Sequence, residues 1–357
     1  MGHQLMEFRF TDEQDMIADT ARSFFAEHAT SERTRAAMAH SDGIDPALWQ
    51  ALGQELGLTG IALPEAHGGA GLGMVELAIL AEAAGYHVAA LPLLSVAVTG
   101  RGIEAGGTDA QKAEWLPRIV SGDVIATAGG ATDVTADGNR LSGTVDMLTH
   151  GAAASLFLIA GQSGAWLVPV DAKGVTVTPL TTMDQTRPFA RLSLDNVEGD
   201  PLADAKAAID AGHEGGWICL AAEALGGAQA CLDRTVAYAK ERIQFGRPIG
   251  SFQAYKHRLA DMMIAIEEAR SAVYWAACAV DERSEDANFA LHAAKSLAAD
   301  VYFKCAGDMI QLHGGIGFTW EHDAHLYFKR ARAIQTLSGT GAQHREAIAR
   351  MILGKAA

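Results

Sequence analysis

Several kinds of residue are scarce in this chain, and each shortage excludes a class of protein. Lys and Arg number 28 against 43 Asp and Glu, which leaves a formal net charge of −15, and the sequence has no basic run. Nucleic-acid binding needs a basic face that displaces counterions from phosphates, so the composition predicts no nucleic-acid partner. The same charge disfavours an anionic membrane surface.

Long apolar runs and paired cysteines are missing as well. No stretch reaches the roughly 18 apolar residues that a bilayer-spanning helix requires, and the N-terminus lacks the pattern of a signal peptide. Proline is scarce, with 9 residues against 38 glycines, which favours tight turns over a disordered linker. We therefore expect a cytoplasmic protein without a membrane partner. Free thiols buried in a reducing compartment are expected at Cys219, Cys231, Cys278 and Cys305.

What is present is a helical pattern interrupted once by strands. Helical periodicity dominates residues 1–122, short β-branched runs replace it over 123–204, and long helices return over 205–357. This order predicts a mostly α fold with a central β-domain, in the form of a small barrel or sandwich, between an N-terminal helical domain and a C-terminal helical domain.

Local signals support two boundaries within this pattern. Thr11 and Gln14 have the spacing of a capping box at the start of the first apolar helix. Asp137 and Gly138 stand between two β-branched runs and predict a tight turn that joins two strands.

Two glycine-containing segments are more specific than packing requires. The first is RIQFG at Arg242–Gly246, followed by Gln253, at the end of a long predicted helix. A cation and a flat ring on a turn can hold a pyrophosphate and pack on a heterocycle. A basic last helical turn with an aromatic anchor would also explain this segment alone.

The second segment is QLHGGIGF at Gln311–Phe318. It follows a helix and not a strand, so it is not the fingerprint of a βαβ dinucleotide fold. Its glycines allow close approach to the backbone, whose N–H groups suit a phosphate or a polar ring edge. An ordinary helix cap would explain this segment alone, but the two segments together favour a nucleotide site.

RIQFGRPIGSFQ, QLHGGIGFTWEHDAHLYFKRARA and LSGTGAQHR resemble the C-terminal domain of the acyl-CoA dehydrogenase family. TDEQDMIADTARSFF, GLTGIALPEAHGGAGLG and LSGTVDMLTHGAAASLFLI are similar to the family's other two parts. The resemblance implies a C-terminal four-helix bundle and FAD held between neighbouring subunits. It also implies α,β-dehydrogenation of an acyl-CoA thioester, with electron-transfer flavoprotein as the acceptor.

The resemblance assigns FAD contacts position by position. In the first motif, where the contacts reach the FAD of a neighbouring subunit, the matched positions are Arg242, Phe245 and Gln253. In the second motif they are Gln311, Gly314 and Gly315. Thr149 matches the threonine beside the flavin ring, and Thr340 matches the threonine near the other half of the cofactor.

The chain departs from the family pattern where the catalytic base belongs. Most members place a glutamate at the position of Ser338, and others place it at the position of Gly216. Neither residue can act as a base near neutral pH. In the β-region, a polar loop that covers the flavin looks deleted between VIATAGG and ATDVTADG, and Met147 replaces a flavin-stacking aromatic residue.

Glu223 is the candidate substitute for the missing base. It lies about two turns beyond Gly216 among apolar residues, and such surroundings would raise its pKa as a base requires. An exposed or interface glutamate paired with an arginine is the competing interpretation. The small residues of 215–227 indicate room for a bulky acyl group. His322 and His325 have no evident third ligand, so we expect no metal.

Three hypotheses follow from these residues. The chain is a catalytic homo-oligomer that uses Glu223, or it is the non-catalytic half of a hetero-oligomer, or it is a relative with oxidase or monooxygenase chemistry. The second hypothesis is favoured because the retained motifs reach across an interface, whereas the lost features serve the chain's own active site. Paired subunits of this kind are known in the family, notably in steroid side-chain degradation.

Overall fold

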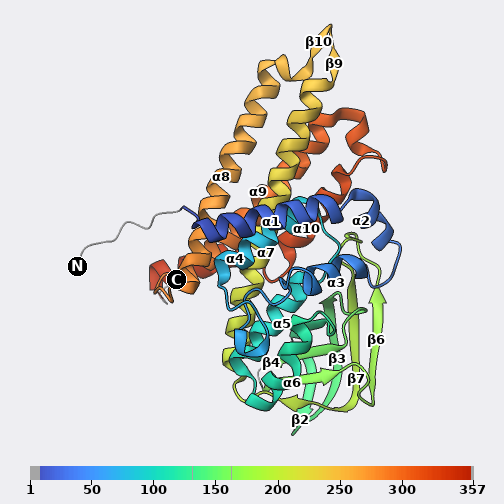
Figure 1. Cartoon of the computed structure of the whole chain (residues 1–357), viewed down its shortest axis with the longest axis vertical. Helices are drawn as coiled ribbons and strands as arrows, with labels where there is room; N and C mark the ends of the chain where they lie inside the picture. Colours follow the sequence, from blue (N-terminus) through green and yellow to red (C-terminus); the bar gives the residue numbers. More distant parts are fainter. Residues whose placement is uncertain (1–8, 131, 162, 355–357) are drawn as a thin grey trace, which may run out of the picture.

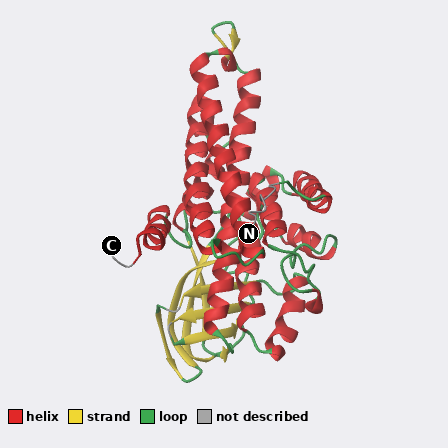
Figure 2. Ribbon diagram, turned by 90° about the vertical axis from the view of Figure 1, so that its left-hand side faces the viewer, coloured by secondary structure: helices red, strands yellow, loops and turns green. Residues whose placement is uncertain are grey.

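The fold is known from a computed structural model that describes residues 9–130, 132–161 and 163–354. Helices form most of it, with strands β1 to β8 gathered at one end and a long pair of helices projecting from the other (Figures 1 and 2). The N-terminal helices are α1 (Asp12–His28), α2 (Ser31–Ala37), α3 (Pro46–Gln54), α4 (Met74–Tyr86), α5 (Leu93–Gly106) and α6 (Asp109–Val120), with a short turn η1 (Glu65–His67).

The strands form two four-stranded sheets, in the orders β1-β4-β5-β8 and β2-β3-β7-β6. Their facing sides share a separate apolar core built from β3, β4, β5 and β7, which makes the region a sandwich. The other side of β4 packs on the helices, because Leu156 and Leu158 belong to the main core. The strands are β1 (Ala126–Gly130), β2 (Asp133–Asp137), β3 (Arg140–Thr149), β4 (Leu156–Gly161), β5 (Gly164–Pro169), β6 (Val175–Leu180), β7 (Phe189–Glu198) and β8 (Asp200–Pro201).

The C-terminal helices pack as a bundle in which α7 and α8 extend beyond the others to a small two-stranded tip (Figure 1). Helix α11 lies against α9 outside the bundle. The elements are α7 (Ala205–Glu241), β9 (Ile243–Gln244), β10 (Arg247–Pro248), η2 (Ile249–Ser251), α8 (Gln253–Asp281), α9 (Ala287–His313), η3 (Gly314–Phe318), α10 (Ala324–Thr336) and α11 (Gly341–Leu353).

The order of helices, sheets and helices confirms the predicted fold class. Helix α1 begins with the expected capping box, in which the side chain of Thr11 accepts from the N–H of Gln14. β2 and β3 pair through the predicted turn, where Gly138 has φ of +59°. The boundaries at 122 and 204 stay predictions, since one core runs through both helical parts.

The small residues of α7 serve close helix packing. A Cβ added at Gly226 would lie 1.9 Å from the carbonyl oxygen of Glu82 on α4, and one at Gly227 would lie 2.3 Å from the ring of Tyr302 on α9. Cβ atoms do not approach other atoms so closely, so these positions are filled by neighbouring helices. The prediction of room for a bulky acyl group is therefore wrong at Gly226 and Gly227.

The structure also tests the expectations about membrane spans and buried thiols. No helix among the described residues is long and apolar enough to cross a membrane. Cys219, Cys231 and Cys305 are buried as free thiols, as expected, whereas Cys278 is only half-buried.

Candidate functional site

The first motif forms the exposed tip of the α7–α8 arm. Helix α7 ends with Arg242 as its C-cap, and β9 then pairs with β10 through a turn at Phe245 and Gly246. Both turn residues have positive φ, +54° and +75°, as in the mirror-image turns that join strands through two residues. The sequence thus holds the ring of Phe245 away from the protein, and 91% of this residue is exposed.

Side chains packed on one another stabilise the tip, and the guanidinium of Arg242 stays exposed beside them. The guanidinium of Arg247 lies 4.0 Å from the ring centre of Phe252, and the rings of Phe245 and Phe252 meet edge to face at 6.2 Å. Arg242 and Gln253 are exposed beside them. An exposed cation next to an exposed flat ring suits a ligand that carries a phosphate and an aromatic heterocycle.

The second motif caps the end of α9. Gly314 has φ of +63° and ψ of −138°, a conformation that favours glycine. A Cβ added at Gly314 or Gly315 would meet no atom within 4 Å, so the space in front of both residues is open to a ligand. Gln311 is exposed on the preceding turn, and Phe318 is 87% exposed on the following one.

The two matched threonines have other partners within the chain. Thr149 ends β3, where its Oγ1 lies 2.8 Å from Ser95 Oγ and its carbonyl accepts from Thr127 at 2.8 Å. Thr340 is the N-cap of α11, and its Oγ1 accepts from the N–H of Gln343 at 3.3 Å. Neither hydroxyl is a free group held toward open space. Their contacts with a cofactor stay predictions.

The two positions at which the family resemblance expects the base lie close together. Trp217, the residue after Gly216, donates from its indole N–H to the carbonyl of Ser338 at 3.1 Å. Ser338 itself has φ of +56°, and His344 Nε2 lies 3.1 Å from the same carbonyl. A Cβ added at Gly216 would lie 2.9 Å from Val98 Cγ2, so a glutamate there would displace its neighbour.

Glu223 lies in a buried ion cluster. Its carboxylate accepts hydrogen bonds from Arg187, in the loop before β7, and from Arg330 on α10. Burial alone would raise the pKa of Glu223, but the charges of the two arginines and their hydrogen bonds outweigh it and lower the pKa. The predicted raised pKa is therefore wrong, and the physical argument for Glu223 as a base fails with it. The predicted arginine pairing is present, but at a buried site.

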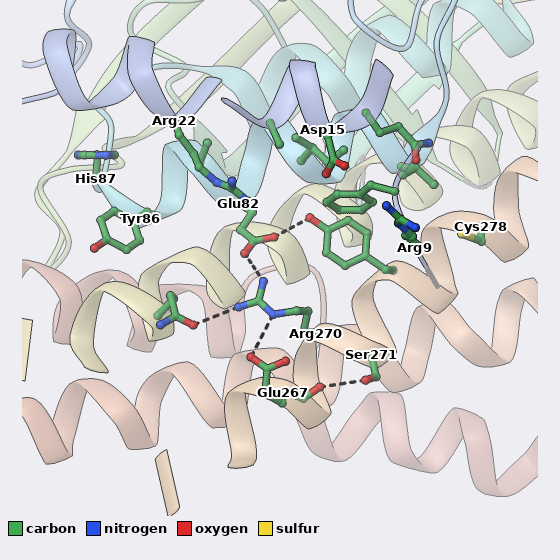
Figure 3. Close-up of a pocket in the computed structure, with 18 of the residues that line it drawn as sticks. Arg9, Asp15, Arg22, Glu82, Tyr86, His87, Glu267, Arg270, Ser271 and Cys278 are labelled. Carbon is green, nitrogen blue, oxygen red and sulfur yellow. Dashed lines mark hydrogen bonds and ion pairs between the residues drawn. The ribbon is translucent and has the colours of Figure 1, made fainter. Parts of the chain in front are cut away.

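A cavity of about 1100 Å³ lies between α1, α4, α7 and α8 and is lined by neither motif (Figure 3). Its polar side chains satisfy one another: Glu82 accepts from Tyr274 at 2.6 Å and from Arg270 at 2.5 Å, and Arg270 also donates to Gln229 at 3.0 Å. Sequence reasoning missed this cavity because its lining comes from four helices distant along the chain.

The histidines do not form a metal centre in the described part of the chain. No group of three or more His, Cys, Asp or Glu side chains there is placed to hold a metal ion. His322 Nδ1 accepts from the N–H of Ala324 at 3.1 Å at the start of α10, and the ring of His325 packs on Trp320 at 4.5 Å.

Buried histidines give the fold a pH dependence that can be measured. Burial lowers the pKa of His344 to about 4, with the charge of Lys295 and the neighbouring His292 adding to the effect, and burial lowers that of His150 well below 6.5. In the unfolded chain both imidazoles take up protons near pH 6.5. Since the unfolded state then binds more protons, stability present above about pH 6.5 is lost as the pH falls toward 4.

We expect the free energy of unfolding in urea to fall between pH 6.5 and 5, by up to about 1.4 kcal/mol per pH unit for each such histidine. The replacement His344→Gln removes one titrating group and is expected to make this slope shallower, whatever it does to stability at pH 7.5. A free energy of unfolding that stays flat over this range would contradict the interpretation.

Comparison with known proteins agrees with the arrangement of domains and motifs. Residues 11–123 match the family model for the acyl-CoA dehydrogenase N-terminal domain, and residues 212–353 match that for the C-terminal domain. The chain is 37% identical to acyl-CoA dehydrogenase IpdE2 of Mycobacterium tuberculosis over 322 residues, which cover 90% of this chain and 91% of that protein.

Two solved structures share the fold along nearly the whole chain. The ChsE4–ChsE5 complex from Mycobacterium tuberculosis aligns with a TM-score of 0.91 and 28% identity, covering 99% of this chain and 100% of the other. The steroid acyl-CoA dehydrogenase Tcur3481–Tcur3483, as a G363A variant, aligns with a TM-score of 0.88 and 34% identity, covering 96% of this chain and 98% of the other.

The chain belongs to the acyl-CoA dehydrogenase family, a family of FAD-dependent oxidoreductases. The predicted family and enzyme class are thereby confirmed.

Proposed function

We propose that this chain is the non-catalytic subunit of a hetero-oligomeric acyl-CoA dehydrogenase, and that its two C-terminal motifs complete an FAD site held mainly by a catalytic partner. One contrast carries the proposal. Arg242, Phe245, Gln311, Gly314 and Gly315 are all exposed, and the space in front of the two glycines is open. The side chains that would serve a site within this chain instead bond to other residues of the chain, as Thr149, Thr340 and Glu223 do.

The outward residues fit a dinucleotide. The guanidinium of Arg242 provides paired donors for a pyrophosphate, and the open backbone at Gly314 and Gly315 admits a sugar or a ring edge. This local cation opposes the net charge of −15, which would otherwise repel the ligand. Bound FAD would supply a hydride acceptor for the acyl β carbon, and the α proton would go to a base that the partner provides.

The two positions at which the family resemblance places a base support the absence of a second active site. Ser338 offers a hydroxyl and no carboxylate, and its backbone is held by Trp217 and His344. Gly216 has no side chain, and a Cβ added there would lie 2.9 Å from Val98 Cγ2. The partner must therefore supply the base, and the acyl group is expected to bind mainly to the partner.

Two relatives support a companion chain and a substrate class. The ChsE4–ChsE5 structure is a complex of two named chains, and Tcur3481–Tcur3483 is a steroid acyl-CoA dehydrogenase. A steroid-derived acyl-CoA is accordingly the first substrate to assay, with electron-transfer flavoprotein or an artificial dye as the acceptor.

Expression of the chain alone and with its companion tests the proposal. Alone, the chain is expected to purify colourless and without dehydrogenase activity. The assembled complex is expected to bind half as many FAD molecules as it has chains and to oxidise the acyl-CoA. Full flavin occupancy with turnover by the isolated chain would instead support a catalytic homo-oligomer, and rapid reoxidation of its flavin by O₂ would support oxidase chemistry.

A further inference from the structure

A column of three rings lies beneath the two flavin-contacting motifs. The ring of Tyr238, near the end of α7, stacks on His313 at 4.5 Å with an angle of 21°, and His313 contacts the ring of His322 at 4.5 Å. The N–H of Arg242 donates to the carbonyl of Tyr238 at 2.9 Å, and His313 directly precedes Gly314. The column thus joins the last turn of α7 to the start of the second motif.

A second link joins the other helix of the arm to α9. The hydroxyl of Tyr255 donates to the carbonyl of Leu312 at 2.8 Å, and burial raises the pKa of this tyrosine to about 12, with Tyr238 adding to the effect. Three residues further along α8, Arg258 pairs with Asp308 at 2.9 Å. The first turn of α8 is thereby fixed against the last turn of α9.

His313 lies between these links and is held by a hydrogen bond to the backbone. Its Nδ1 lies 2.7 Å from the carbonyl of Met309, which makes Nδ1 the donor. Burial lowers the pKa of His313. The nearby charge of Arg234 adds to this effect, whereas the hydrogen bond to Met309 opposes it. Only 4% of His313 is exposed, so the ring acts within the protein and does not itself reach a ligand.

The far end of the column is fixed to the N-terminal part of the chain. Asp323, next to His322, accepts from Arg35 and from Ser31 on α2 at 2.7 Å each. The loop that follows the second motif is therefore held at a second point. The two motifs, more than sixty residues apart in sequence, are thus connected through the ring column and the link at Tyr255.

We propose that Tyr238, His313 and Tyr255 are positioning residues that fix the two motifs relative to each other, so that the chain grips FAD as one rigid unit. The inference rests on the proposed function. The α7–α8 arm projects beyond the rest of the bundle (Figure 1), and without these links its tip would move relative to Gly314. A rigid pair of contacts loses less conformational freedom on binding than two independent contacts, and its dissociation is slower.

The test uses the assembled two-subunit complex and single-residue variants. Tyr238→Leu removes the stacked ring, Tyr238→Phe keeps it as the matched control, and Tyr255→Phe removes only the hydroxyl. Dissociation constants and release rates for FAD are measured by flavin fluorescence. Tyr238→Leu and Tyr255→Phe are expected to weaken FAD binding about tenfold, mainly through faster release, whereas Tyr238→Phe stays within about twofold of the parent.

A double-mutant cycle separates positioning from general stability. Arg242→Ala and Gln311→Ala each remove one contact, and their effects on FAD affinity are expected to be non-additive in the parent complex but additive in the Tyr238→Leu background. FAD affinity unchanged in both link variants, together with coupling unchanged in the Tyr238→Leu background, would overturn the inference and leave the proposed function standing. A parent complex that binds no FAD would instead overturn the proposed function.

Discussion

Replacing Arg242 by alanine in the assembled complex is expected to raise the dissociation constant for FAD by about 10- to 100-fold, because hydrogen bonds to charged groups contribute about 1.5–3 kcal/mol each. The guanidinium is exposed at the tip of the arm, where it opposes the acidic field of the chain. Its removal leaves a pyrophosphate facing net negative charge. Titration of the apo complex with FAD, followed by flavin fluorescence, measures the change.

Two further variants serve as controls for the loss of Arg242. Arg242→Lys keeps the charge but loses the planar pair of donors, so an intermediate affinity is expected. Arg140→Ala removes an exposed arginine of the β-domain that pairs with Glu198 at 3.3 Å, and it should leave FAD affinity unchanged. Since Arg242 is exposed, its loss should hardly alter the unfolding temperature. An Arg242→Ala complex with parental affinity would remove the basis for the proposed FAD grip.

The fold and both motifs could be predicted from sequence because the signals are local. The capping box at Thr11, the turn at Gly138 and the glycine break at Gly314 each depend on a few neighbouring residues. At the tip of the arm, Gly246 favours a turn because glycine adopts positive φ readily, whereas the positive φ of Phe245 opposes the preference of a bulky residue and is not predicted by the sequence. Short-range conformational preferences are what a single sequence records most directly.

The environment of α7 could not be predicted because it depends on distant parts of the chain. Arg187 precedes Glu223 by 36 residues and Arg330 follows it by 107, so neither partner is visible from the apolar neighbours of Glu223. The same limit applies to Gly226, whose small size indicated open space but serves contact with α4. An apolar helix with glycines is compatible with a cavity or with close packing, and only the neighbouring helices decide between them.

The cluster around Glu223 connects three parts of the fold. Arg187 comes from the loop before β7, Glu223 from α7 and Arg330 from α10, and the side chains of all three are less than 10% exposed. Arg330 also pairs with a second carboxylate, since its Nε donates to Asp184 at 3.1 Å. Arg187 has fewer partners, because its Nε and Nη1 have no hydrogen-bond partner among the described residues. Glu223 is therefore the main compensation for the charge of Arg187.

Replacing Glu223 by glutamine is accordingly expected to destabilise the protein by about 3–5 kcal/mol, the usual cost of leaving one member of a buried ion pair without its partner. Glutamine has nearly the same shape, so the loss reflects charge and not a cavity. Equilibrium unfolding in urea measures it, and Glu267→Gln, at a site 60% exposed, serves as the control with a change below about 0.5 kcal/mol.

The same variant separates a structural glutamate from a catalytic one. A base that is lost without structural cost gives a folded protein of parental stability whose turnover vanishes. A carboxylate that neutralises two buried guanidiniums gives the reverse, a less stable protein in which any turnover of the complex scales with the folded fraction. If Glu223→Gln has the stability of the parent, the buried cluster does not depend on the charge of Glu223. Glu223 would then again be a candidate base.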